Sequence, residues 1–153
     1  MSKVCVLGAG TMGAGIAQTF ASNGFQVVLR DIKQEFVDRG LEIIEKNINR
    51  LSAKGKLTEE QASKILANVQ GTIDIEQAKD CILVVEAAVE NMTIKKTIFA
   101  ELDNVCGANT IFATNTSSLS ITEVAAATSR PDKVIGMHFF NPAPVMKLVE
   151  IIK

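Results

Sequence analysis

The chain contains no tryptophan, no tyrosine and a single histidine in 153 residues. It therefore has few aromatic rings on which nucleotide bases could stack, and its formal net charge of −1 offers no basic surface for nucleic acid. Long hydrophobic runs are also missing, because the apolar stretch at residues 81–85 is interrupted by Glu86. The N-terminus enters a strand directly and shows no targeting segment. These absences exclude nucleic-acid binding and a membrane-spanning segment.

Cysteine is scarce, and its three positions share no metal-ligand spacing. Cys5, Cys81 and Cys106 are odd in number, so we predict free thiols in a reducing compartment, no metal site and a cytoplasmic protein. Cys5 and Cys81 fall in predicted buried strands. They are expected to be small core residues and not nucleophiles.

A glycine-rich segment follows the first apolar run. Residues 3–7 have the length of a buried strand, residues 8–13 read G-x-G-x-x-G, and an alanine-rich helix start comes next. Here the glycines allow a tight turn, a close approach of a pyrophosphate and close packing of helix on strand. The helix N-terminus offers N–H groups and a positive dipole end to phosphates. The predicted cofactor-binding residues of this segment are Gly8, Ala9, Gly10, Thr11, Met12 and Gly13.

An acidic residue ends the second apolar run. Asp31 stands about 20 residues after the glycines, where a carboxylate accepts hydrogen bonds from ribose hydroxyls and repels a 2′-phosphate, so we predict NAD as the cofactor. The adjacent Arg30 keeps NADP open, since its guanidinium could meet that phosphate or stack beside the adenine. Neighbouring strand residues point to opposite faces, which argues against both addressing one ribose oxygen.

Residues 34–70 are predicted to form a helical hairpin inserted into the alternating pattern. Apolar residues recur at steps of three and four from Val37 to Leu51, and Gly55 ends this helix. Thr58 and Gln61 then form the capping box of a second helix. The hairpin is too long for a simple crossover, so we expect it to project from the sheet or to lie across one side of the ligand cleft.

Two cations lie on one side of the first of these helices. Asn47, Arg50 and Lys54 are spaced by three and four residues, next to the apolar stripe. The cations could meet phosphates, although a solvated helix face explains the same pattern.

Strands and helices alternate again after Gly71. We predict strands at Ile73, 81–85 and 110–114, and helices at 92–102 and 121–128, which is the pattern of a parallel sheet with right-handed crossovers. The strand ends at 8–13, 31, 86–90 and 115–118 are polar or glycine-rich and should share one cleft. The predicted fold class is α/β: a Rossmann-type, doubly wound, mostly parallel sheet in one domain, with the helical hairpin and antiparallel final strands.

The last two apolar runs are joined by only six residues. A link of residues 141–146 is too short for a parallel crossover, so residues 134–140 and 147–152 should be antiparallel neighbours. In a symmetric hairpin His138 then stands opposite Glu150 on the same face. A carboxylate there would fix the imidazole tautomer and favour its charged form, which makes His138 a candidate catalytic residue.

With these residues in hand, the chain resembles the nucleotide-binding domain of the 3-hydroxyacyl-CoA dehydrogenase family over essentially its whole length. Four segments carry the resemblance: GAGTMG at 8–13, VEAAVEN at 85–91, TNTSSL at 114–119 and HFFNPAPVMKLVE at 138–150. The last segment is close to diagnostic.

The resemblance implies an oxidoreductase that interconverts 3-hydroxyacyl-CoA, such as (S)-3-hydroxybutyryl-CoA, and 3-ketoacyl-CoA with NAD(H), in butyrate formation or fatty-acid metabolism. It implies that His138 is the general acid/base, that Glu150 orients it, and that Ser117 can donate a hydrogen bond to the C3 oxygen. The implied cofactor contacts are Asp31, Glu90, Lys95, Asn115, Ser117 and Asn141, and the implied substrate contacts are Ser117, Asn141, Arg50 and Lys54.

Members of the family continue into a helical domain of similar size, which completes the active site and carries the dimer interface. We therefore expect residues 1–153 to be the NAD-binding domain alone, and the longer protein to be a homo-oligomer. Two alternatives remain: a dinucleotide-binding module without turnover, or with a structural role as in the related lambda-crystallins, and a small 3-hydroxyacid dehydrogenase. The second resembles this chain only in its first thirty residues.

Overall fold

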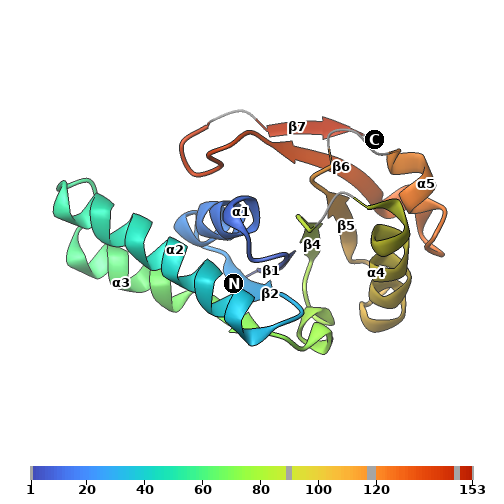
Figure 1. Cartoon of the computed structure of the whole chain (residues 1–153), viewed down its shortest axis with the longest axis horizontal. Helices are drawn as coiled ribbons and strands as arrows, with labels where there is room; N and C mark the ends of the chain where they lie inside the picture. Colours follow the sequence, from blue (N-terminus) through green and yellow to red (C-terminus); the bar gives the residue numbers. More distant parts are fainter. Residues whose placement is uncertain (1, 89–90, 117–119, 147–148, 153) are drawn as a thin grey trace.

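Seven strands form one sheet in the computed structural model, which describes residues 2–88, 91–116, 120–146 and 149–152 (Figure 1). Their spatial order is β3-β2-β1-β4-β5-β6-β7, and every neighbouring pair is parallel except the antiparallel pair of β6 and β7. The strands are β1 (Lys3–Leu7), β2 (Gln26–Arg30), β3 (Val69–Thr72), β4 (Leu83–Glu86), β5 (Ile111–Thr114), β6 (Val134–Phe139) and β7 (Val149–Ile152). The predicted doubly wound sheet with antiparallel final strands is confirmed.

Helices cover both faces of this sheet. The first three pack on one face, and α4 and α5 pack on the other with the short 3₁₀ turn η1 (Figure 1). The helical elements are α1 (Thr11–Ser22), α2 (Gln34–Ala53), α3 (Glu59–Ala67), η1 (Ile75–Ala78), α4 (Met92–Val105), α5 (Ile121–Ala125) and η2 (Pro131–Lys133). The winding reverses between β1 and β4, and ligands of such sheets bind at the carboxyl ends of the strands beside this reversal.

Strand β1, the third in this order, contributes side chains to two separate apolar cores. Val4 and Val6 belong to the core under α1 and α2, whereas Cys5 and Leu7 belong to the core under α4. Successive side chains of a strand point to opposite faces, so a strand covered on both faces reads as an unbroken apolar run. This explains why β1 shows no alternation in the sequence.

The hairpin of α2 and α3 projects beyond the sheet (Figure 1). Gly55, at φ = +75°, ends the turn after α2, and the predicted capping box is confirmed: Gln61 N donates to Thr58 Oγ1 (3.0 Å) and Thr58 N donates to Gln61 Oε1 (2.9 Å). Asn47 Nδ2 of α2 donates to the buried Gln18 Oε1 of α1 at 3.1 Å, which ties the hairpin to the helix that packs on the sheet.

Several strand boundaries differ from the sequence prediction, most clearly those of β3 and β4. The third strand lies at 69–72 and excludes Ile73, which is 49% exposed, because β3 pairs with β2 from Val69 onward. Gly71 was expected to punctuate the chain, yet it lies within β3, where an added Cβ would meet Val37 Cγ1 at 2.5 Å. Cys81 is buried as predicted, but it precedes β4 and is not part of it.

The three cysteines are buried free thiols in the core under α4. Burial raises the pKa of Cys5, that of Cys81 to about 12 and that of Cys106 to about 11. A thiol reacts as the thiolate, so these groups are inert while the chain is folded.

We expect iodoacetamide at pH 8 to leave all three cysteines unmodified in the native protein and to alkylate them in urea, as read by mass spectrometry. The unfolded thiols lose protons near pH 9 and the folded ones do not, so the unfolded state gains stability as pH rises. The free energy of unfolding should fall progressively from about pH 9 to pH 12. Alkylation of the native protein at the rate of a free thiol would contradict this assignment.

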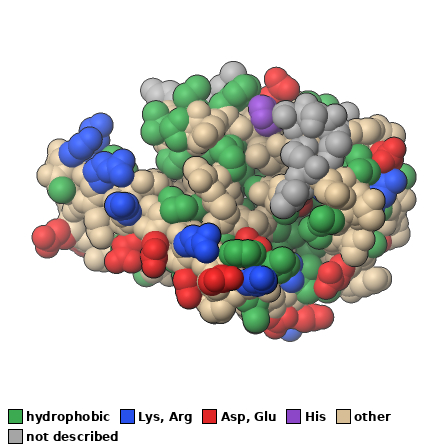
Figure 2. Space-filling model, viewed as in Figure 1, with side chains coloured by type: hydrophobic (Ala, Val, Ile, Leu, Met, Phe, Trp, Pro, Cys, Tyr) green, Lys and Arg blue, Asp and Glu red, His purple; other side chains and the backbone are tan. Residues whose placement is uncertain are grey.

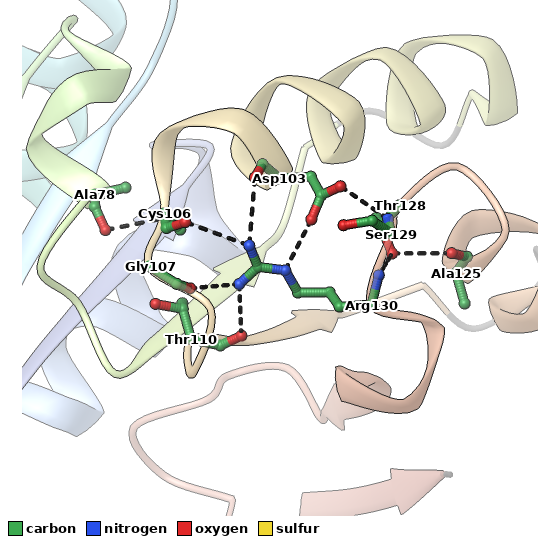
Figure 3. A network of polar contacts seen from close by, with 9 residues as sticks. All are labelled: Ala78, Asp103, Cys106, Gly107, Thr110, Ala125, Thr128, Ser129 and Arg130. Carbon is green, nitrogen blue, oxygen red and sulfur yellow. Dashed lines mark hydrogen bonds and ion pairs between the residues drawn. The ribbon is translucent and has the colours of Figure 1, made fainter.

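A buried arginine joins the end of α4 to the segment before β6 (Figure 3). The Arg130 guanidinium donates through Nε to Asp103 Oδ1 (2.8 Å) and through its other nitrogens to the backbone oxygens of Asp103, Cys106, Gly107 and Thr110. Burial disfavours the charged Asp103, but hydrogen bonds from Ser129 and Arg130 outweigh it and hold the pKa of this carboxyl below its usual range. The network supplies partners for the last carbonyls of α4 and fixes the start of β6, the strand that carries His138.

Candidate active site

The glycine loop between β1 and α1 has the geometry of a dinucleotide cradle. Gly8 adopts φ = +102°, and its N–H donates to Arg30 O at 2.8 Å, which joins the loop to the end of β2. At Gly13 an added Cβ would stand 1.6 Å from Gly8 O, so only glycine lets α1 approach the loop this closely. At Gly10 an added Cβ would meet nothing within 4 Å, which leaves open space beside the loop.

The N-terminus of α1 is suited to an anion. Gly10 is the N-cap residue, so no side-chain oxygen caps the helix, and the first turn contains no acidic residue. Its N–H groups and the positive end of the helix dipole are therefore available to a phosphate. Open space at Gly10 and an uncapped helix fit the pyrophosphate of a dinucleotide.

Asp31 lies directly beside this loop at the end of β2. Its Oδ2 accepts from Ala9 N at 2.8 Å and its Oδ1 accepts from Ile32 N at 2.7 Å. Each carboxylate oxygen keeps lone pairs for ribose hydroxyls. A hollow of about 260 Å³ opens here, bounded by the glycine loop, Asp31 and the α2 residues Phe36, Arg39 and Ile43.

Gly40 is a site residue that the sequence reasoning missed. It lies in α2, and an added Cβ would stand 2.8 Å from both Cβ and O of Ala9. Glycine at this point lets α2 rest on the glycine loop and form the outer wall of the hollow. A glycine inside a strongly amphipathic helix was the available signal, because such a residue costs helix stability unless packing requires it.

The adjacent Arg30 kept NADP open in the sequence, and the structure shows where its side chain is held. Arg30 Nε donates to Ile73 O at 3.1 Å, so the guanidinium is held against the chain that follows β3. Asp31, the next residue, faces the glycine loop. The cation that lines the hollow is Arg39.

A buried ionic cluster lies behind the loop, at the end of β4. Glu86 and Lys95 have 0% and 1% exposed side chains, and the Lys95 ammonium donates to Glu86 Oε1. The same oxygen accepts from Thr114 Oγ1 at 2.8 Å, and Glu86 Oε2 accepts from Ala88 N at 2.6 Å. The backbone after β4 is thereby fixed where it meets the glycine loop, since an added Cβ on Gly8 would stand 2.7 Å from Ala87 O. The implied contact of Lys95 with the cofactor stays a prediction.

The predicted pairing of His138 with Glu150 is confirmed. The two residues are directly opposite in the antiparallel register of β6 and β7, so their side chains project from the same face. The His138 ring packs edge-on against Phe140, with ring centroids 4.8 Å apart. Among the described residues no hydrogen bond or ion pair joins the imidazole to Glu150, which is exposed to solvent.

Asn115 and the loop after β6 connect this pair to the cofactor region. Asn115 Oδ1 accepts from Phe139 N at 2.8 Å, which joins the end of β5 to β6 beside His138. The loop that carries Asn141 packs on α1, because an added Cβ on Gly15 would meet Pro144 Cδ at 3.1 Å. The described parts of the predicted strand ends, residues 8–13, 31, 86–88 and 115–116, therefore lie at one edge of the sheet.

The remaining predicted site residues are Ser117, Glu90, Arg50 and Lys54. Ser117 and Glu90 are outside the described residues. Arg50 and Lys54 are exposed near the free end of the hairpin, where Figure 2 shows Lys and Arg side chains gathered. In the described ranges no cluster of three or more His, Cys, Asp or Glu side chains could hold a metal ion, and none of the helices there is long and apolar enough to span a bilayer.

This fold and the glycine loop define a dinucleotide-binding domain in which His138 stands opposite Glu150, and domains of this class are found in NAD-dependent oxidoreductases. Residues 3–153 match the family described as "3-hydroxyacyl-CoA dehydrogenase, NAD binding domain". The chain belongs to this family, and NAD is its cofactor.

Three similar proteins are all named 3-hydroxybutyryl-CoA dehydrogenase. The chain is 54% identical over 150 residues to a 3-hydroxybutyryl-CoA dehydrogenase of Clostridioides difficile, covering 98% of this chain and 53% of that protein. A crystal structure of 3-hydroxybutyryl-CoA dehydrogenase from Escherichia coli matches with a TM-score of 0.96 and 47% identity, over 98% of this chain and 32% of that one. The crystal structure of (S)-3-hydroxybutyryl-CoA dehydrogenase from Ralstonia eutropha matches with a TM-score of 0.95 and 46% identity, over 99% of this chain and 53% of that one. The chain thus spans about half, or less, of the length of these relatives.

Proposed function

We propose that this chain is the cofactor-binding part of an enzyme that interconverts (S)-3-hydroxybutyryl-CoA and acetoacetyl-CoA with NAD(H). The observation that carries the proposal is the register of β6 and β7, which sets His138 opposite Glu150 at the edge of the sheet that also holds the glycine loop. The names of the relatives from Clostridioides difficile and Ralstonia eutropha support the choice of acyl group.

In this reaction His138 is the proton carrier. Its imidazole accepts the proton of the C3 hydroxyl during oxidation, and the imidazolium returns it during reduction. An imidazole can both accept and donate a proton, so the same group serves both directions. Glu150, across the strand pair, orients the ring and stabilises the imidazolium. Bound NAD(H) supplies the hydride acceptor or donor.

Other side chains bind and position the reactants. Ser117 donates to the C3 oxygen, and Asn141 lies where substrate and cofactor meet. Glu90, Lys95 and Asn115 support the cofactor, while Arg50 and Lys54 at the free end of the hairpin attract the phosphates of CoA. The working enzyme includes a helical domain in addition to residues 1–153, forms a homo-oligomer and acts in the cytoplasm.

The two alternatives predict different observations. A small 3-hydroxyacid dehydrogenase would share only the first thirty residues, whereas the family match here runs from residue 3 to residue 153. A dinucleotide-binding module without turnover would bind NADH but fail to oxidise it in either form of the protein tested below.

The test is acetoacetyl-CoA-dependent oxidation of NADH, measured for this chain and for a version that includes the helical domain, together with NADH binding to both. We expect both forms to bind NADH and only the longer one to turn over efficiently, because part of the substrate cleft comes from the helical domain. Absence of NADH binding would overturn the proposal, and efficient turnover by residues 1–153 alone would overturn the need for a second domain.

A further inference from the structure

The hollow beside Asp31 contains a cation without a polar partner. Arg39 lines it, is exposed, and makes no hydrogen bond or ion pair with any residue that the structure describes. Within the described residues it makes a cation–π contact with the Phe36 ring, whose centroid lies 5.8 Å from the guanidinium carbon. A guanidinium in this position can turn toward a ligand without breaking any contact of the folded chain except the one with this ring.

The hollow lies where the outer side of a bound adenosine ribose would be. Its walls are Asp31 with the glycine loop on one side and Phe36 and Arg39 of α2 on the other. Gly40 holds α2 against Ala9, so the distance between these walls is set by backbone contact and not by mobile side chains. At about 260 Å³ the hollow has room for a phosphate group next to a ribose.

Asp31 makes the hollow unfavourable for a second anion. Its carboxylate accepts two backbone N–H groups at 2.7 and 2.8 Å, which keeps it facing the loop. A ribose 2′-phosphate in the hollow would gain Arg39 but would stand beside this negative charge.

We propose that Arg39 is a latent anchor for a 2′-phosphate on the adenosine ribose, and that Asp31 alone keeps it from selecting NADP(H). The proposal rests on the NAD site of the proposed function and adds the residue that determines cofactor choice when Asp31 is replaced. Arginine suits this role because its planar fork donates two parallel hydrogen bonds to a phosphate.

The experiment is a double-mutant cycle on the 153-residue chain, with affinities for NADH and NADPH measured by nicotinamide fluorescence. Asp31→Ser is expected to raise NADPH affinity by about tenfold or more, because a like charge next to the phosphate is removed. Relative to Asp31→Ser, the double variant Asp31→Ser/Arg39→Gln should bind NADPH about tenfold more weakly and should bind NADH with an affinity unchanged within about twofold. Adenosine 2′,5′-bisphosphate competing against adenosine 5′-monophosphate should show the same pattern, which isolates the adenosine half. Asp31→Asn replaces Asp31→Ser if the latter does not fold.

Two neighbouring cations serve as matched controls in the same background. Arg30→Gln removes a guanidinium that is held by Ile73 O, and Lys33→Gln removes an ammonium that lies 5.6 Å from the Phe36 centroid but does not line the hollow. Neither should reduce NADPH affinity by more than about twofold. If the gain survives Arg39→Gln, or disappears equally with Lys33→Gln, the assignment of Arg39 is wrong although NADH still binds. If the wild type binds neither nucleotide, the cofactor site itself fails, and this inference with it.

Discussion

Replacing His138 by glutamine is expected to lower turnover by about 10²- to 10⁴-fold, the usual contribution of a positioned general acid/base. Glutamine keeps a polar group of similar size but cannot take up or release a proton near neutral pH. No other histidine in the chain can substitute for it, since His138 is the only one. The measurement is NADH oxidation with acetoacetyl-CoA, in the version of the protein that includes the helical domain.

Cofactor affinity should change little in the same variant. The glycine loop follows β1, and β6 stands three strands away, which is about 14 Å at the usual spacing of strands. His138→Gln should therefore keep NADH affinity within about twofold while the chemical step is lost.

Glu150→Gln is the matched control for this prediction. It keeps a hydrogen-bonding group opposite the imidazole and removes only the charge that stabilises the imidazolium, so its loss of turnover should be smaller than that of His138→Gln. Equal turnover of wild type and His138→Gln would remove the imidazole from the mechanism.

The second large effect is expected in stability, at the buried pair of Glu86 and Lys95. Lys95→Met leaves a buried carboxylate with Thr114 Oγ1 and Ala88 N as its partners among the described residues, and Glu86→Gln leaves a buried ammonium without its carboxylate. Breaking such a pair from one side costs about 3–5 kcal/mol, whereas replacing both partners removes most of that penalty. The double variant Glu86→Gln/Lys95→Met should be more stable than the sum of the single effects predicts, by about 2 kcal/mol or more.

Lys96 provides the matched control, because it is the next residue and also forms an ion pair. Its ammonium is 3.2 Å from Glu123, and both side chains are about half exposed, at 44% and 53%. Lys96→Met should cost less than about 1 kcal/mol. The free energies of unfolding come from urea titrations of all variants. Similar small losses for Lys95→Met and Lys96→Met would show that burial does not strengthen the Lys95 contact.

Local sequence patterns predicted much of this molecule because their causes are local. The capping box of Thr58 and Gln61 needs only the two residues and the chain between them. The pairing of His138 with Glu150 could be predicted as well, because a six-residue link between two apolar runs leaves few registers.

The errors concern contacts between segments that are distant in the sequence. Glycine is typical of turns, yet Gly71 lies in β3. The helix α2 passes directly over this position and leaves no room for a Cβ. The sequence alone could not rank Arg30 against Arg39, because only the paths of β3 and α2 decide which of them lines the hollow beside Asp31. The contact of Lys95 with the cofactor stays a prediction, but its ion pair with Glu86 could not be foreseen, because it forms only when α4 packs beside β4.

At Gly40 the helix α2 packs directly on Ala9 of the glycine loop, so the angle of the helix at this contact determines where its far end lies. From Gly40 to Lys54 the helix rises by about 21 Å, so a tilt of about 5° at this contact displaces the cationic end by roughly 2 Å. A displacement of that size is enough to form or break a hydrogen bond. The backbone contact at Gly40 and the hydrogen bond from Asn47 of α2 to Gln18 of α1 both limit that tilt, so packing at these two points sets where Arg50 and Lys54 lie relative to the glycine loop.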